Sequence, residues 1–127
     1  MPWPTFRRLL DIGGIDWFSL QVGTAPGDGA PGLTDLAPHL TDFAETAAAM
    51  AHLDMIVSVD SAPAHLAGAL GRPVAILVSF DPDCRWLLDR ADTPWYPGAT
   101  LFRQPAPGDW ASVVDAVASY VEAATKA

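Results

Sequence analysis

The apolar residues of this chain gather in short continuous runs, and polar or helically spaced segments separate them. The clearest runs are Met55–Val59 and Val74–Val78, and Trp17–Gln21 is a third that is rich in aromatic residues. Runs of this length without alternation are typical of strands buried on both faces of a parallel sheet. Leu33–Leu36 and Leu101–Phe102 are predicted as two further short strands.

The segments between these runs carry helix signals. The predicted helices are Phe6–Ile12, a helix from Thr41 or Asp42 to about His52, Ser61–Leu70, and Trp110 to about Thr125. We expect Thr5, Asp42 and Asp109 to act as N-caps, and Gly71 to end the third helix. Strands that alternate with helices predict an α/β fold, a Rossmann-like parallel sheet with helices on both faces.

Two segments are predicted to be irregular. Residues 23–32 hold four glycines and two prolines, and residues 79–98 are dense in Pro, Asp and Trp. A loop as long as the second is uncommon in a compact fold and is usually functional or disordered. We expect Trp86, Trp95 and Tyr96 to pack this loop down, and Cys84 to be an inert, partly buried thiol. The length of 127 residues predicts one domain over residues 1–127.

The charge balance excludes some classes of partner. The net charge is −8, from 15 acidic and 7 basic residues, so binding to nucleic acid is not expected. A bound phosphate would have to be held by backbone N–H groups, a helix N-terminus or a few arginines. One cysteine allows neither an intrachain disulfide nor a Cys-rich metal site. We expect no metal and no cofactor.

The composition also bears on location. A single cysteine fits a reducing compartment, and the first residues lack the apolar segment of a signal peptide, so we expect a cytoplasmic protein. The longest apolar run, Val74–Val78, is far too short to span a bilayer.

The segment Asp60-Ser-Ala-Pro-Ala-His65 is the strongest candidate for a ligand site. It follows the strand Met55–Val59 and begins a helix, and ligands of open parallel sheets bind beyond the C-terminal ends of strands. Free N–H groups and the helix dipole would attract an anion there. From the residues alone, two other readings stay open: Asp60 and Ser61 as an ordinary N-cap pair, and His65 as a satisfied core histidine.

Several segments of the chain carry a family resemblance. They are Asp42-Phe-Ala-Glu-Thr46, Leu53–Asp60, Ala64–Gly71, Arg72-Pro-Val74, Pro82-Asp-Cys-Arg-Trp86, Asp92–Pro97, Phe102–Pro105 and Pro107–Trp110. From about Trp17 onward the chain resembles the C-terminal domain of heptosyltransferase-like family 9 glycosyltransferases. The bacterial members fused to tetratricopeptide repeats look most similar.

The resemblance implies a GT-B architecture, in which two Rossmann-like domains face a cleft and the second domain holds a nucleotide-diphosphate sugar. Asp60 would then contact sugar hydroxyls. Ser61 and the N–H of Ala62 would hold the diphosphate, with His65 supporting the site. No metal ion would be needed. Many family members carry Gly where this chain has Ala62, whose methyl group leaves less room for a close approach of backbone to phosphate.

Three further residues are candidates for contact with the donor. Gln21 would reach the base or the ribose, or it is a surface residue at a strand end. Glu45 would reach the ribose, although its place in the first turn of a helix is explained by capping. Arg85 would pair with a phosphate or, as a structural salt bridge, with Asp81.

The resemblance also implies that parts of a complete enzyme are missing. A GT-B enzyme needs a second lobe for its acceptor, and family members carry a central strand ahead of the first helix. We therefore expect the isolated chain to lack transfer activity and its unpaired sheet edges to favour a homo-oligomer. The alternative is a non-catalytic binding or oligomerisation module. A dinucleotide-binding protein is disfavoured because no G-x-G-x-x-G follows the first strand.

Overall fold

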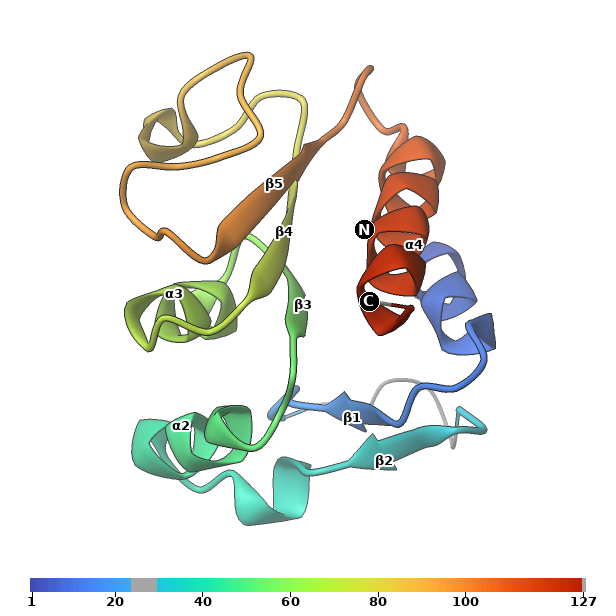
Figure 1. Ribbon diagram of the computed structural model, residues 1–127, viewed down its shortest axis with the longest axis vertical. Coiled ribbons are helices and arrows are strands. Elements are labelled where there is room, and N and C mark those ends of the chain that lie inside the picture. The colour runs from blue at the N-terminus through green and yellow to red at the C-terminus, as the bar shows by residue number, and fades with distance from the viewer. Residues whose placement is uncertain (24–29, 127) are drawn as a thin grey trace.

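The computed structural model describes residues 1–23 and 30–126, and Figure 1 shows the order of their elements. The helices are α1 (Trp3–Phe6), α2 (Phe43–Ala51), α3 (Ala62–Ala69) and α4 (Trp110–Thr125), with 3-10 turns η1 (Arg7–Asp11), η2 (Ala37–His39) and η3 (Cys84–Trp86). The strands are β1 (Trp17–Ser19), β2 (Leu33–Asp35), β3 (Ile56–Val59), β4 (Val74–Val78) and β5 (Ala99–Arg103). Part of the predicted loop 23–32, including Pro26, Gly27 and Gly29, lies outside the described residues.

All strand pairs of the described chain are parallel. β4 lies between β3 and β5, with Ile76 opposite Ser58 on one side and Leu101 on the other. β1 pairs with β2 in a separate two-stranded sheet. α2 lies between β2 and β3, α3 between β3 and β4, and a loop with the 3-10 turn η3 between β4 and β5. Helices cover the sheet, so the α/β, Rossmann-like prediction is confirmed. The arrangement is consistent with one half of a GT-B fold.

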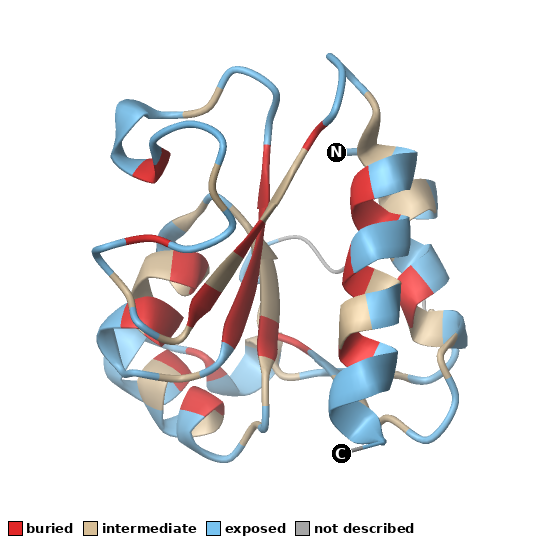
Figure 2. Cartoon of the chain, turned by 45° about the horizontal axis from the view of Figure 1, so that its top comes forward, coloured by how far each residue is buried: buried red, intermediate tan, exposed pale blue. Residues whose placement is uncertain are grey.

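Each face of the three-stranded sheet is covered by a different pair of helical segments (Figure 1). On one face, alternate residues of β4 pack with Met50 of α2 and with Ala64 and Ala67 of α3. On the other face, Leu77 packs with the valines of α4 and with Leu9 of η1. Figure 2 shows the buried residues concentrated along this sheet and on the helix sides that face it. Helices on both faces are thus confirmed.

Helix caps follow the predicted chemistry in two of three places. The side chain of Asp42 accepts a hydrogen bond from the N–H of Glu45 at 2.8 Å, and Asp109 accepts from the N–H of Ser112 at 3.1 Å. Thr5 is wrong as a cap, because the first helix begins at Trp3 with Pro2 as its N-cap. A proline fits the start of a helix, where its missing N–H would have no partner.

The end of α3 also agrees with its predicted signal. Gly71 has φ +69°, and its N–H donates to the carbonyl of Gly68 while the N–H of Arg72 donates to that of Ala67. This pair of bonds is the left-handed glycine cap that closes many helices. Among the described residues, no helix is both long enough and apolar enough to cross a bilayer.

The prediction that Trp17–Gln21 is a buried strand is wrong. β1 has three residues, of which only Ser19 is buried, and Phe18 is 40% exposed. The physical reason is its position: within the described residues β1 pairs only with β2, and β3 only with β4, so each has one unpaired edge. Unpaired edges were expected, and the division into two sheets agrees with that expectation.

Candidate functional site

Asp60 follows β3 directly, and its carboxylate makes two side-chain contacts. The indole Nε1 of Trp86 donates to Oδ2 at 2.8 Å, and Nε2 of His65 lies 3.2 Å from Oδ1. The Asp60 side chain keeps 35% exposure, so part of its acceptor capacity faces solvent. Its partners are side chains of α3 and η3, and Asp60 does not cap the helix. Ser61 does hold the N-cap position of α3, but its side chain makes no cap hydrogen bond.

His65 connects three segments of the chain. Its ring stacks on Trp86, with ring centroids 5.4 Å apart and planes at 17°, and its Nδ1 lies 2.8 Å from the hydroxyl of Tyr96. Tyr96 in turn packs on Gly68, where an added Cβ would lie 2.4 Å from the ring. The His65 side chain is 26% exposed and so is not a fully buried core residue. The glycine is required because α3 and Tyr96 approach each other so closely.

Two opposed neighbours compete for Nε2 of the His65 ring. Oδ1 of Asp60, which only accepts, and Nη1 of Arg85, which only donates, each lie 3.2 Å from it. Nε2 donates to Asp60 in one tautomer and accepts from Arg85 in the other, and Nδ1 accordingly accepts from or donates to the hydroxyl of Tyr96. Nη1 carries two hydrogens, and the ring uses at most one of them. At least one Nη1 hydrogen of Arg85 is therefore left for a ligand or for solvent in either tautomer.

Asp83 holds Arg85 from the opposite side. Its Oδ1 accepts from Nε of Arg85 at 3.0 Å, and its Oδ2 accepts from Nη2 at 3.2 Å. Hydrogen bonds from the guanidinium and from the N–H of Arg85 lower the pKa of Asp83 from 3.8 to about 2, and the same pairing raises the pKa of Arg85. A salt bridge was predicted with Asp81, and the structure corrects that partner to Asp83. The two oxygens of the Asp83 carboxylate bind Nε and Nη2 on one edge of the guanidinium, and Nη1 is left facing His65.

These side chains line a pocket of about 240 Å³, walled by His65, Arg85, Trp95 and Tyr96. Trp95 is 65% exposed, and its Nε1 donates to the carbonyl of Arg85 at 3.1 Å. The prediction that three aromatic residues pack the loop down is thus correct for the buried Trp86 and the half-buried Tyr96, and wrong for Trp95. Held by its N–H edge, the indole of Trp95 keeps an exposed surface beside the pocket.

The start of α3 offers fewer free N–H groups than we expected. Pro63 has none, and the N–H groups of Ala64 and His65 already donate to the carbonyl of Ser61 at 3.1 and 3.3 Å. The Ser61 hydroxyl lies 3.0 Å from that of Ser58 and donates to the carbonyl of Val59. No described group accepts from the N–H of Ala62, which is exposed. One backbone N–H and the helix dipole therefore remain for an anion.

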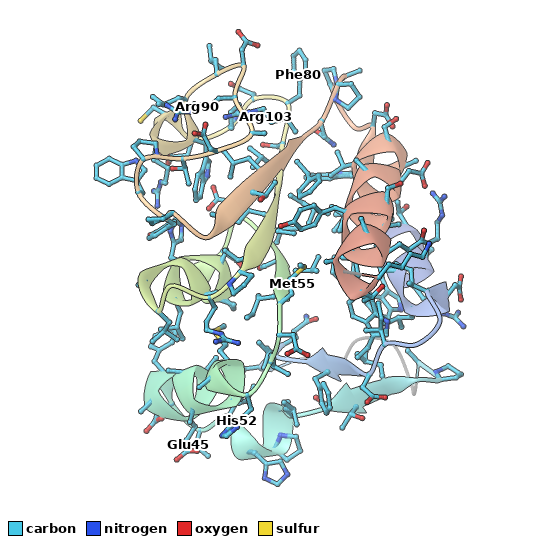
Figure 3. All side chains as sticks on the ribbon, viewed as in Figure 1. Glu45, His52, Met55, Phe80, Arg90 and Arg103 are labelled. Carbon is cyan, nitrogen blue, oxygen red and sulfur yellow. The ribbon has the colours of Figure 1, made fainter. Side chains whose placement is uncertain are left out.

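Arg103, at the end of β5, holds the irregular loop over the pocket. Its guanidinium donates to three carbonyls of the loop, those of Trp86, Leu87 and Arg90. Figure 3 shows Arg103 and Arg90 in this region of the molecule. Leu87 and Asp89 have φ values of +58° and +56°, which favour glycine. Such backbone strain persists only where surrounding contacts fix it, and it concentrates at functional sites.

Two predicted site residues lie outside the cluster. Glu45 is on α2, and Figure 3 places it at the far end of the molecule from Arg90 and Arg103. Gln21 is exposed just after β1. In the described part of the chain, neither side chain bonds to Asp60, His65 or Arg85. Their contact with a donor stays a prediction. Cys84, expected to be partly buried, is exposed, because η3 turns it outward.

Comparison with known protein families finds a match over the middle of the chain. Residues 27–83 match the family model described as glycosyltransferase family 9 (heptosyltransferase). The matched segment contains β3, Asp60, the start of α3 and His65, and it ends at Asp83. The residues that complete the pocket, Arg85, Trp95 and Tyr96, follow the matched segment. No curated protein and no solved structure matches the chain.

Proposed function

We propose that this chain is the donor-binding domain of a glycosyltransferase and binds a nucleotide-diphosphate sugar at the Asp60–His65 turn. One observation carries the proposal. At the end of β3, inside the segment similar to family 9 glycosyltransferases, a partly exposed carboxylate is fixed by Trp86 and His65 beside an open pocket. Ligands of parallel sheets bind at such strand ends.

The role of each residue follows from the hydrogen-bonding groups that its contacts within the chain leave free. The N–H of Ala62 and the positive end of the α3 dipole face the diphosphate and stabilise the charge that develops on it as leaving group. Asp60 accepts from sugar hydroxyls with the lone pairs that Trp86 and His65 leave free. His65 fixes Asp60, and its ring is in turn fixed by Trp86 and Tyr96. Contacts with the base or ribose by Gln21 and Glu45 belong to the proposal as well.

We expect the isolated chain to bind the donor and not to transfer the sugar. Transfer needs a base that activates an acceptor hydroxyl, and that base must be within hydrogen-bond reach. Both ring nitrogens of His65 are engaged, one with Tyr96 and one beside Asp60. Measurable transfer from any nucleotide sugar by the purified 127-residue chain would contradict this expectation.

A second candidate is a non-catalytic oligomerisation module. The unpaired edges of β1 and β3 favour it, because an exposed strand edge can pair with another copy. Light scattering across protein concentrations separates the two functions. A stable oligomer that binds no nucleotide supports the module, and a chain that binds nucleotide supports the donor domain.

The test of the main proposal is calorimetric titration with uridine, guanosine and adenosine diphosphates. We expect at least one to bind, and Asp60→Ala and His65→Ala to weaken the binding of its sugar conjugate by about tenfold or more, the cost of a lost charged hydrogen bond and of its positioning partner. Asp54→Ala and His52→Ala are matched controls. Both residues are exposed, Asp54 precedes β3 at its opposite end, and His52 caps α2. The wild type binding none of the three, or losing as much affinity in the controls, would overturn the proposal.

A further inference from the structure

The pocket beside His65 is built largely by the loop that follows β4. Arg85, Trp95 and Tyr96 all come from this loop, and they meet His65 of α3 around a volume of about 240 Å³. The loop is held in place by Arg103 and by the buried Trp86. Its walls are thus fixed before any ligand arrives, as in a preformed binding site.

The charges around the pocket do not suit a further phosphate. Asp83 neutralises Arg85 through two contacts, at 3.0 and 3.2 Å, and the low pKa of Asp83 keeps this pair ionised over the neutral range. Asp60 adds a second carboxylate next to the same guanidinium. Two carboxylates against one guanidinium leave a negative balance when His65 is neutral. An anion would be repelled, whereas an uncharged polar ligand would not.

The free hydrogen-bonding groups suit hydroxyls. Nη1 of Arg85 donates, the remaining lone pairs of Asp60 accept, and the Tyr96 hydroxyl, which is hydrogen-bonded to His65, keeps either an acceptor lone pair or its hydrogen for a ligand. A hydroxyl both donates and accepts, so several adjacent hydroxyls can satisfy all three groups. Beside them, the Trp95 side chain is 65% exposed and its N–H is occupied by the carbonyl of Arg85. The aromatic face is electron-rich and favours the weakly positive C–H groups of a saturated ring.

We infer that this pocket takes the sugar ring of the donor, as an uncharged hexose that packs on Trp95 and hydrogen-bonds to Arg85. The inference rests on the proposed donor-binding function. A nucleotide sugar is an extended molecule, and its diphosphate lies between the nucleoside and the sugar. With the diphosphate at Ala62, one end of the nucleotide sugar enters the pocket next to His65 on the β4 side. The negative charge balance of the pocket and its groups that bond to hydroxyls favour the sugar end.

The measured quantity is the affinity gained by adding the sugar to the nucleotide. Uridine, guanosine and adenosine diphosphates are titrated beside uridine diphosphate glucose, uridine diphosphate N-acetylglucosamine, guanosine diphosphate mannose and adenosine diphosphate glucose. We expect the wild type to bind at least one conjugate more tightly than its parent nucleotide. Trp95→Ala and Arg85→Met should each reduce this gain by about threefold to tenfold, the range expected for loss of a stacked ring or a hydrogen bond.

Matched variants separate recognition from folding. Trp95→Phe keeps an aromatic face and should retain most of the gain. Leu88→Ala removes a side chain of the same loop that is 73% exposed and does not line the pocket, so the gain should be unchanged. In Trp95→Ala, affinity for the parent nucleotide should stay within about twofold of the wild type because the diphosphate site is untouched.

Three results would contradict either the sugar-pocket inference or the donor-binding function on which it rests. Equal losses for nucleotide and conjugate in Trp95→Ala would show that Trp95 contacts the nucleoside, and they would overturn the inference. Wild-type binding of nucleotides with no gain from any of the four sugars would also overturn it, while leaving the proposed function intact. No binding of any of the seven compounds would contradict the proposed function itself.

Discussion

The two sheets of this molecule differ in how completely they are covered. Every residue of β4 is buried, because strands flank it on both sides and helices cover both faces. In β1, one residue of three is buried, and the strand has a partner on one side only. Both strands are apolar runs in the sequence, so composition does not distinguish them. Their burial is decided by the number of neighbours that each strand has.

The candidate site belongs to the well-covered part. Asp60 and α3 follow β3, the loop with Arg85 and Trp95 follows β4, and Arg103 ends β5. Gln21, the one predicted donor contact from the two-stranded sheet, follows β1. We therefore expect substitutions in the larger sheet to affect stability and binding strongly. Equivalent substitutions in β1 should affect them little.

The largest difference should be in stability. Ile76 of β4 is 0% exposed, whereas Phe18 of β1 is 40% exposed. Ile76→Ala should lower the free energy of unfolding by about 2–5 kcal/mol because it leaves a cavity in close-packed surroundings. Phe18→Ala should cost less than about 1 kcal/mol, since much of its ring is already hydrated. Urea unfolding of the two variants measures both values, and equal losses would remove the distinction between the sheets.

The contact between α3 and Tyr96 should be the next most sensitive. Gly68→Ala places a methyl group 2.4 Å from the ring, so Tyr96 must move and its bond to His65 with it. We expect a loss of about 1–3 kcal/mol, typical of overpacking, together with weaker nucleotide binding. Gly13→Ala is the control, because nothing lies within 4 Å of its added Cβ. Unchanged nucleotide affinity in Gly68→Ala would show that the position of Tyr96 does not affect nucleotide binding.

The loop over the pocket should open when Arg103 is replaced. Arg103→Met removes the hydrogen bonds to the carbonyls of Trp86, Leu87 and Arg90. Trypsin should then cleave after Arg90 faster, by about tenfold, because each lost bond to a charged donor frees a loop carbonyl and lowers the cost of local opening. Arg7 and Arg8, the first two residues of η1, provide the internal reference. If cleavage after Arg90 stays as slow as in the wild type, the loop is held by other contacts.

The smallest effect should be a pH dependence from Asp83. Its pKa in the folded chain is about 2, below the usual 3.8, because Arg85 donates hydrogen bonds to it. A carboxyl with a depressed folded pKa stabilises the fold above the usual value, and this contribution is lost as the pH falls from about 4 toward 2. Asp83→Asn should therefore flatten the unfolding profile slightly in this window. An identical profile in wild type and variant would show that the pair contributes nothing.

Much of the fold was predictable because its signals are local. The continuous run Val74–Val78 gave β4, and the caps at Asp42, Asp109 and Gly71 set helix ends within a residue or two. The burial of β1 was not predictable, because it depends on pairing between distant segments. β5 is longer than expected, spanning Ala99–Arg103, since its polar residues are held in register by β4.

The candidate site also has one part that was predictable from local signals and another that depends on distant contacts. Asp60 and His65 were predictable from their spacing across a strand end and one helical turn. The arrangement of the loop 79–98 was not, because Trp86, Tyr96 and Arg103 fix it through contacts with α3 and with distant carbonyls. The partner of Arg85 illustrates this: Asp81 and Asp83 are both near in sequence, and only the turn of η3 decides between them.

The central claim is that a nucleotide binds where β3 meets α3. Amide chemical-shift mapping tests it most directly, using the uniformly labelled chain and a saturating nucleoside diphosphate from the titrations. The largest shifts are expected at the amides of Ala62, Ala64 and His65, with smaller ones at Arg85. Shifts confined to β1 and β2, or none above the noise at the start of α3, would contradict it.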